Sequence, residues 1–239
     1  MELDEYTKMF GHEDRYWWFV ARRRLALRLL DSSTKPGVIL DFGCGTGAVL
    51  AELNKRGLAI GLDRSALALE YCQKRGLERL VLADGERIPL ANARVDAMIA
   101  LDIFEHIEDV EHAFAESFRV LKPGGRLIVS VPAYAWLWGP HDVALMHKRR
   151  YTRRDLRAVL SKSGFHVERS GYSLFFLFPA VVFVRILDKL NRGEARVSLP
   201  KLPNWLNSLL IWGQEVEASL SMVISLPWGS SVVAVAKKP

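Results

Sequence analysis

A short apolar run that ends in a glycine-rich turn is the feature that most constrains how this chain can fold. The apolar run 38–40 is followed by Asp41-Phe42-Gly43-Cys44-Gly45-Thr46-Gly47, and a helix-forming segment begins directly after it. Glycine lacks a Cβ atom, so it adopts positive φ angles and lets a ligand approach the backbone closely. The pattern therefore predicts a buried strand, a ligand-binding turn and a helix, in that order.

The spacing of the glycines and the acid before them limit the kind of ligand. A dinucleotide fingerprint has the spacing G-x-G-x-x-G, whereas the turn here has the spacing G-x-G-x-G. Asp41 would repel the oxygens of a pyrophosphate and would attract an ammonium group or a water molecule bound to one. We therefore expect a ligand that carries a cation, and we disfavour a nicotinamide dinucleotide.

Strand and helix signals alternate along most of the chain. Apolar runs predict strands at 38–42, 59–62, 80–83, 97–101, 126–131 and 166–171, and a last strand at 231–236. Helical patterns lie at 16–30, 48–56, 65–75, 109–121 and 153–163. This order is typical of an α/β protein with a doubly wound parallel sheet.

Composition indicates one packed domain of 239 residues. Half of the residues are hydrophobic, which excludes intrinsic disorder, and two cysteines are too few for a disulfide framework. The longest apolar run, 174–184, contains Pro179 and ends at Arg185, so it is too short to span a membrane. The first residues are acidic and do not resemble a secretory signal, and we expect a cytoplasmic protein.

The single domain 1–239 divides into four expected segments. Residues 36–172 form the ligand-binding core, 173–228 an apolar helical insertion and 229–239 the last strand. Residues 1–35 are expected to form an N-terminal helical lid, because four large side chains gather there: Tyr16, Trp17, Trp18 and Phe19. So much apolar surface must pack, either over the ligand cleft or in the ordinary core.

Carboxylates follow the second and third predicted strands. Asp63 can accept hydrogen bonds from both hydroxyls of a ribose, or it can serve as an acid at the start of the helix that follows Ser65. Asp84 is either a second ligand-binding acid or a solvated turn residue. Both acids are expected at the same edge of the sheet as the glycine turn, because the carboxyl ends of parallel strands lie together.

Five motifs in this order resemble the class I S-adenosylmethionine-dependent methyltransferases across roughly residues 36–131. They are D-F-G-C-G-T-G, G-L-D, A-D-G, D-A-M-I-A-L-D-I-F-E-H-I and L-K-P-G-G. The resemblance implies a Rossmann-like, seven-stranded and mostly parallel sheet with an antiparallel last strand, and S-adenosyl-L-methionine as cofactor. The flanks, which include Trp17-Trp18-Phe19 and 147–151, are similar to a bacterial group of small methyltransferases described as type 11, 12 or 23.

The resemblance also implies a role for each motif. The glycine turn passes under the methionine part of the cofactor, and the acid ahead of it helps to hold the amino group. The acid after the second strand binds the ribose, the acid and glycine after the third strand bind the adenine amino group, and the end of strand four lines the methyl-transfer site. The cofactor-binding residues implied in this way are Asp41, Gly43, Gly45, Gly47, Asp63, Asp84, Gly85 and Leu101.

A general base is needed only if the acceptor holds its proton tightly, because the cofactor supplies an activated methyl group. The candidates follow strands four and five: Asp102, His106, and His141 with the neighbouring Asp142. His106 has an alternative role as the first part of the next helix. We expect no metal site, since Glu105, His106 and His141 have no spacing that demands one.

Two features of the sequence indicate what kind of molecule accepts the methyl group: a basic cluster and the apolar insertion. The cluster consists of Lys148, Arg149, Arg150, Arg153, Arg154 and Arg157. Cations at the start of a helix oppose its dipole, so the cluster indicates either a phosphate or carboxylate on the substrate or an ordinary solvated surface. The insertion carries many aromatic residues, which form a second small core, an apolar substrate tunnel or a membrane-contacting face.

Three hypotheses follow for the whole chain. The first is a methyltransferase that acts on O, N or C of a small hydrophobic or lipid-linked acceptor, with 173–228 in peripheral contact with the inner face of a membrane. The second is an RNA methyltransferase that uses the basic cluster for phosphates, although nucleic acid is the less expected partner. The third is a non-catalytic regulatory protein that binds the cofactor. The sequence predicts no oligomeric state.

Overall fold

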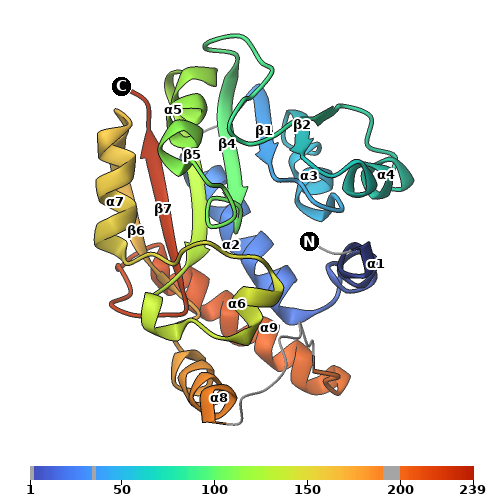
Figure 1. The fold of residues 1–239 in the computed structure, drawn as a ribbon, viewed down its shortest axis with the longest axis vertical. Coiled ribbons are helices and arrows are strands. Elements are labelled where there is room, and N and C mark those ends of the chain that lie inside the picture. Colours follow the sequence, from blue (N-terminus) through green and yellow to red (C-terminus); the bar gives the residue numbers. More distant parts are fainter. Residues whose placement is uncertain (1–2, 34–35, 191–199) are drawn as a thin grey trace.

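A twisted seven-stranded sheet forms the centre of the molecule in the computed structural model, which describes residues 3–33, 36–190 and 200–239 (Figure 1). The strand order is β3-β2-β1-β4-β5-β7-β6. The strands are β1 (Val38–Phe42), β2 (Leu58–Asp63), β3 (Leu80–Leu82), β4 (Val95–Leu101), β5 (Leu121–Pro132), β6 (His166–Ser173) and β7 (Ser231–Lys237).

The pairing of the strands confirms the predicted fold class. β1 to β5 pair in parallel, and β7 runs antiparallel to both of its neighbours, β5 and β6. One strand boundary differs from the expectation, since β5 begins at Leu121 rather than at Arg126. The segment Lys122-Pro123-Gly124-Gly125, which the sequence predicts as a helix-closing turn, follows Leu121 directly, and the pairing of β5 with β4 shifts register there.

Helices cover both faces of the sheet, and each face has its own apolar core. On one face, α5 (Val110–Val120) and α7 (Arg153–Lys162) pack over buried side chains such as Phe42, Phe104 and Phe114. On the other, α2 (Trp17–Ser33), α3 (Ala48–Leu53) and α4 (Ala66–Lys74) pack over side chains such as Leu30 and Ile39. Burial on both faces explains why the central strands read as continuous apolar runs.

The strand order reverses between β1 and β4, which lie next to each other although two strands separate them in sequence. In an open α/β sheet this reversal opens a crevice at the carboxyl ends of the strands, where ligands bind. The segments after β1, β2, β3, β4 and β5 all start from this edge. The topology therefore brings the predicted site motifs together.

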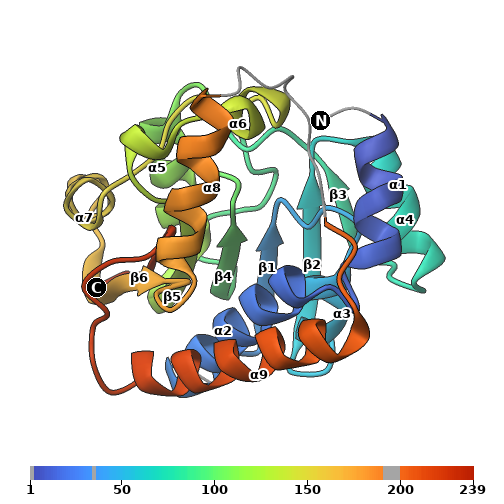
Figure 2. The same ribbon diagram turned by 90° about the horizontal axis from the view of Figure 1, so that it is seen from below.

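An additional helix, α1 (Leu3–His12), precedes the single N-terminal helix that the sequence predicts. It lies beside α4, with the rings of Phe10 and Tyr71 4.7 Å apart at their centroids. A hydrogen bond between the hydroxyls of Thr7 and Tyr71, 2.8 Å long, joins the same two helices. α1 thus sits beside the part of the sheet formed by β2 and β3, and α2 begins five residues after α1 ends (Figure 2).

The insertion between β6 and β7 contains two helices, α8 (Phe178–Leu190) and α9 (Asn204–Ser221). α9 lies along α2, and α8 lies near the short helix α6 (Pro140–Ala144), which follows β5 and a 3₁₀ turn at Ala135–Leu137 (Figure 2). Residues 191–199 of the expected insertion 173–228 fall outside the described residues. Within the described parts of the chain, no helix combines the length and the apolar character needed to cross a membrane.

Candidate functional site

The glycine turn between β1 and α3 has the backbone conformation that its composition predicts. Gly43, Gly45 and Gly47 have φ angles of +76°, +53° and +92°. A Cβ atom on Gly43 would lie 2.7 Å from the side chain of Ile103, so steric space as well as φ requires glycine there. The turn therefore presents bare backbone at the carboxyl edge of the sheet, as a ligand cradle needs.

Asp41 lies at the floor of this turn and has an unsatisfied side chain. It is buried, and its Oδ2 atom has no hydrogen-bond partner among the described residues. Burial, together with the nearby carboxylate of Asp63, raises the pKa of Asp41 to about 8. A buried carboxylate without a partner is costly, and a bound ammonium group would remove that cost by supplying both charge and a donor.

Asp63 ends β2 and holds the glycine turn against α4. Its Oδ2 accepts a hydrogen bond of 2.9 Å from the amide of Gly45, and its Oδ1 accepts one of 2.9 Å from the amide of Ser65. Ser65 is the N-cap of α4 and accepts from the amide of Ala68. The two roles considered for Asp63 are thus compatible, since a carboxylate that bonds both segments still has free lone pairs.

Asp84 and Gly85 follow β3 on the same edge. Asp84 is exposed, and its Oδ1 accepts a hydrogen bond from the amide of Glu86 at 3.3 Å. A Cβ atom on Gly85 would lie 2.8 Å from both Ile107 and Phe42. Close packing explains the glycine, and the exposed Asp84 stays a predicted adenine ligand.

Helix α1 and the segment after it close over the glycine turn. A Cβ atom on Gly45 would lie 2.8 Å from the Cε atom of Met9. The carboxylate of Glu13 accepts hydrogen bonds from the hydroxyl of Thr46 and, at 2.7 Å, from the guanidinium of Arg75. The sequence predicts that the aromatic residues 16–19 pack over the cleft or in the core, but it does not predict the contacts of Met9 and Glu13. The spacing of Met9 and Glu13, one helical turn, is the signal that could have indicated a helix there.

Leu101 and Asp102 end β4, next to the glycine turn in the strand order. Asp102 has a φ angle of +53°, which is rare for a residue other than glycine. Its Oδ2 pairs with the guanidinium of Arg22 from α2, and its Oδ1 accepts from the hydroxyl of Ser130 at 3.3 Å. Strained backbone at a strand end is typical of binding sites, and the pairing with Arg22 fixes the side chain.

The structure corrects the predicted partnership of His141 and Asp142. Asp142 is buried and accepts hydrogen bonds from Arg150 Nε at 2.8 Å and from the amide of Gly139 at 2.9 Å. Its Oδ1 also lies 2.8 Å from Nδ1 of His147. His141 and Asp142 both lie in the short helix α6 rather than in a loop, so their side chains point in different directions. Asp142 therefore orients His147 instead of His141.

His141 stays a predicted catalytic residue with a different environment from the one expected. Burial, and in second place the charge of Arg185, lower its pKa to about 4. The ring is therefore neutral at pH 7 and can accept a proton, but it is a weak base.

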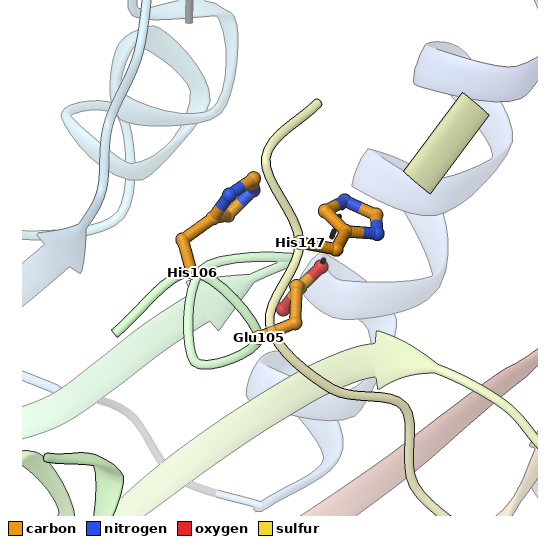
Figure 3. Close-up of side chains that lie close together, drawn as sticks. All are labelled: Glu105, His106 and His147. Carbon is orange, nitrogen blue, oxygen red and sulfur yellow. Dashed lines mark ion pairs between the residues drawn. The ribbon is translucent and has the colours of Figure 1, made fainter. Parts of the chain in front are cut away.

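Three ligand-type side chains meet between the β4–α5 loop and the segment after α6 (Figure 3). They are Glu105, His106 and His147, and one donor atom from each lies within 4.8 Å of the others. His147 therefore takes the place that the sequence analysis considered for His141 beside Glu105 and His106. Glu105 is fully buried, and burial raises its pKa well above the usual value, while burial and the neighbouring His147 lower the pKa of His106 to about 4.

Much of the basic cluster is engaged within the protein. Lys148 pairs with the carboxylate of Glu108, and Arg149 donates to the backbone carbonyl of the same residue at 2.9 Å. Arg150 is bound to Asp142 and to the backbone carbonyl of Ala133. The start of the cluster therefore anchors the segment after α6 to its neighbours.

A recess opens on the other half of the carboxyl edge, between α2, α9 and the ends of β4 to β7. Its lining includes Trp18, Leu101, Ser130, Leu174, Gln214 and Glu217. The recess touches Leu101 and Arg22, the partner of Asp102, so it adjoins the end of β4. The recess is small, with a volume of about 30 Å³, and its lining combines apolar side chains such as those of Trp18 and Leu174 with polar ones.

The residues at the ends of β1 to β3, which form the first half of the carboxyl edge, fit the cofactor implied by the resemblance. S-adenosyl-L-methionine carries a cationic ammonium group, for which the unpartnered carboxylate of Asp41 is a suitable partner. The turn at Gly43 leaves the backbone open to close approach. The chemistry of this donor set therefore agrees with the cofactor.

Comparison with known proteins points to one family. A family model described as a methyltransferase domain matches residues 40–129. A malonyl-[acyl-carrier protein] O-methyltransferase from Geobacter sulfurreducens is 30% identical over 74% of this chain and 73% of its own length. A tRNA (carboxymethyluridine(34)-5-O)-methyltransferase from Arabidopsis thaliana is 34% identical, over 50% of this chain and 29% of its own length.

Other relatives are longer than this chain, and a solved structure supports the fold. Matches from Mycolicibacterium smegmatis, Streptomyces fradiae and Methylovorus cover 62%, 60% and 50% of those proteins' own length. A solved S-adenosylmethionine-dependent methyltransferase from Thermotoga maritima superimposes with a TM-score of 0.66 at 18% identity, over 99% of this chain and 96% of that one. The motifs, the strand order and these matches agree, and the chain belongs to the class I S-adenosylmethionine-dependent methyltransferases.

Proposed function

We propose that this methyltransferase transfers the methyl group of S-adenosyl-L-methionine to a small hydrophobic or lipid-linked acceptor that it meets at a membrane surface. The observation that carries the proposal is the outer face of α9, which leaves a row of large apolar side chains in solvent beside the recess. The cofactor, when bound, supplies the activated methyl group. The protein then has to hold the cofactor, align the acceptor with it and exclude water.

The outer face of α9 has the wrong polarity for a helix that contacts only water. Its exposed residues follow helical spacing: Trp205, Leu209, Trp212, Val216 and Leu220. Trp205 and Trp212 expose 68% and 65% of their surface. A surface helix normally directs its apolar stripe toward the core, so this stripe requires an apolar environment outside the protein.

The inner face of α9 explains why the stripe points outward. Glu215 pairs with Arg24 and Arg28 of α2 at 2.9 and 2.8 Å. Glu217 is buried and accepts a hydrogen bond of 3.1 Å from the amide of Phe176. These polar contacts favour this orientation of the helix about its own axis, because turning the apolar stripe inward would break two partly exposed ion pairs and the hydrogen bond of the buried Glu217.

Helix α8 and the chain after α9 add to the same kind of surface. On α8 the exposed apolar side chains are Phe183, Val184, Ile186 and Leu187, and after α9 they are Val223, Ile224 and Trp228. Tryptophan prefers the boundary between water and lipid, where its ring is apolar and its N–H still finds a partner. A membrane would cover these exposed apolar side chains. It would also be the place where the proposed apolar acceptor is dissolved.

The relatives with named acceptors act on two different classes of molecule. Two of them are methyltransferases for malonyl groups carried on acyl-carrier protein. The tRNA methyltransferase relative acts on nucleic acid, but Lys148, Arg149 and Arg150 are largely bound to groups of this protein. The geometry therefore favours the apolar acceptor over RNA.

A labelling experiment tests the proposal directly. The purified chain is incubated with methyl-tritiated S-adenosylmethionine and a bacterial extract that contains membranes, and the organic-soluble, aqueous, protein and nucleic-acid fractions are counted. We expect label in the organic fraction that is absent with an Asp63→Ala control. Label in RNA would contradict the proposal, and so would cofactor binding without label in any fraction, which favours a non-catalytic binding protein.

A further inference from the structure

We propose that Glu105, His106 and His147 form a binding site for one divalent transition-metal ion. The three side chains come from two segments that follow neighbouring strands, β4 and β5 (Figure 3). One ligand atom of each lies within 4.8 Å of the others. Two atoms bound to one ion at about 2.1 Å are at most about 4.2 Å apart, so a small side-chain rotation completes the site.

Glu105 supplies the strongest part of the argument. Its side chain is completely buried, and neither carboxylate oxygen has a hydrogen-bond partner on another described residue. Buried carboxylates are normally paired, hydrogen-bonded or bound to a metal. The nearest basic groups are already engaged, since Arg150 is bound to Asp142 and Arg22 to Asp102. A cation between Glu105 and the imidazoles would satisfy it.

His147 is oriented as a metal ligand. Its Nδ1 lies 2.8 Å from Asp142 Oδ1, and its Nε2 lies 4.0 Å from Glu105 Oε1. In the neutral ring, the proton on Nδ1 is donated to Asp142, so Nε2 presents a lone pair toward the carboxylate of Glu105. Nε2 and Oε1 lie no farther apart than two ligand atoms of one ion, so a single ion can bind both. A carboxylate behind a ligating histidine is a common arrangement at metal sites.

His106 provides the third ligand. It follows Glu105 directly in the loop between β4 and α5, and one of its ring nitrogens lies within 4.8 Å of the ligand atoms of Glu105 and His147. Its ring centroid lies 4.8 Å from that of His147, with the planes 77° apart.

The ligand set selects the class of ion. Two imidazoles and one carboxylate suit zinc and its transition-metal neighbours, whereas magnesium and calcium prefer oxygen ligands. Three protein ligands leave at least one coordination position open, as in catalytic zinc sites. That position would bind an acceptor oxygen and lower its pKa, a use that rests on the proposed function. Binding of the ion does not rest on it.

Metal titration of the full chain tests the site without an activity assay. The protein is stripped with a chelator, and binding of Zn²⁺ is measured by calorimetry and that of Co²⁺ by its visible absorption. We expect one ion per chain, and at least tenfold weaker Zn²⁺ binding in both Glu105→Gln and His147→Gln. The exposed His112 on α5 supplies the matched control, and His112→Ala should bind as the parent does.

Further variants keep the outcome decisive if Glu105→Gln does not fold. His106→Gln should also weaken Zn²⁺ binding, and Asp142→Asn should weaken it about 10- to 100-fold, because it replaces the carboxylate behind His147 with a neutral amide. Retained binding of S-adenosylhomocysteine shows that a variant is folded. The inference is overturned if the parent binds less than one ion per chain, or if folded variants bind Zn²⁺ as tightly as the parent. Zn²⁺ binding without methyl transfer would refute the proposed function alone.

Discussion

Charged side chains have different partners in the two halves of the carboxyl edge of the sheet. At the ends of β1 to β3, the carboxylate of Asp41 is buried without a full set of partners, beside a glycine turn that leaves the backbone bare. At the ends of β4 and β5, charged groups are mostly paired with one another, as in Asp102 with Arg22 and Asp142 with Arg150. The first half is open to a cationic ligand at Asp41, and the second half is a paired network in which Glu105 is the exception.

The covering helices differ in the same way. α1 and the residue after it, Glu13, bind the glycine turn through Thr46 and Arg75. α9 covers the second half with its polar side and leaves an apolar stripe outside. In the first, cofactor half the contacts of the covering segment lie within the chain, whereas in the second, acceptor half the outer face of α9 is exposed to solvent.

The largest expected effect comes from the unpartnered acid. Asp41→Asn should weaken binding of S-adenosylmethionine by about 3 kcal/mol or more, that is at least about a hundredfold, because it leaves a buried ammonium group unpaired. Calorimetric titration with the cofactor measures this change. An affinity equal to that of the parent would contradict the assignment of Asp41 and remove the contrast between the two halves.

The same variant should change stability in the opposite direction. The pKa of Asp41 is raised from 3.8 to about 8, so between these values the folded state holds a proton that the unfolded chain has lost. The free energy of unfolding therefore falls as the pH rises through this window, and the neutral amide of the Asp41→Asn variant carries no such penalty. Denaturant melts of the cofactor-free protein at pH 5 and pH 8 should show Asp41→Asn gaining stability over the parent at the higher pH.

The second largest effect concerns Asp63. Asp63→Ala should weaken cofactor binding by about 1.5 to 3 kcal/mol, the range for hydrogen bonds to a charged group, while the sheet stays folded. Ser65→Ala is the matched control, because it removes the cap of α4 but leaves the turn contact of Asp63 to Gly45. It should cost about 1 kcal/mol of stability and leave the affinity unchanged. Equal loss of affinity in both variants would reduce Asp63 to a helix-capping role.

The cofactor half could be predicted from the sequence because each of its parts is local. The glycine turn, the acid two residues before it and the acid at the end of β2 each depend on one strand and the turn that follows it. Parallel strands then bring these ends together without further information. Helix α1 was not predicted, since its contacts to Gly45 and Thr46 involve segments more than 30 residues away.

The acceptor half could not be predicted in the same way because its contacts join distant segments. Arg22 and Asp102 are 80 residues apart in sequence. Asp142 contacts His147 rather than its neighbour His141 because His141 and Asp142 lie in the helix α6. The sequence predicts a helical insertion at 173–228, but it does not say which face of each helix is buried. The ion pairs of Glu215 with α2 decide that, and they direct the apolar stripe outward.

A smaller effect is expected at His141, within the second half. His141→Ala should lower turnover about tenfold, or about 1.4 kcal/mol, and leave cofactor affinity unchanged, because we expect the residue on the acceptor side. His166→Ala, on an exposed histidine at the start of β6, is the control. Because the pKa of His141 is near 4, it should add no pH dependence to turnover between pH 6 and 8. Equal losses of turnover and cofactor affinity would place His141 in the cofactor half.

The smallest effect tests the exposed stripe by comparing two exposed leucines. Leu209 lies on the outer face of α9 and Leu58 at the start of β2, at the opposite edge of the sheet, with 51% and 43% of their surfaces exposed. Replacing either with Ser should change the free energy of unfolding by no more than about 0.5 kcal/mol, because neither is buried. Only Leu209→Ser should weaken binding to vesicles of anionic lipid, by about 1 kcal/mol or about fivefold, since it alone would lose apolar contact with the lipid. Cosedimentation measures this difference, and equal binding of both variants would mean that α9 does not contact the membrane.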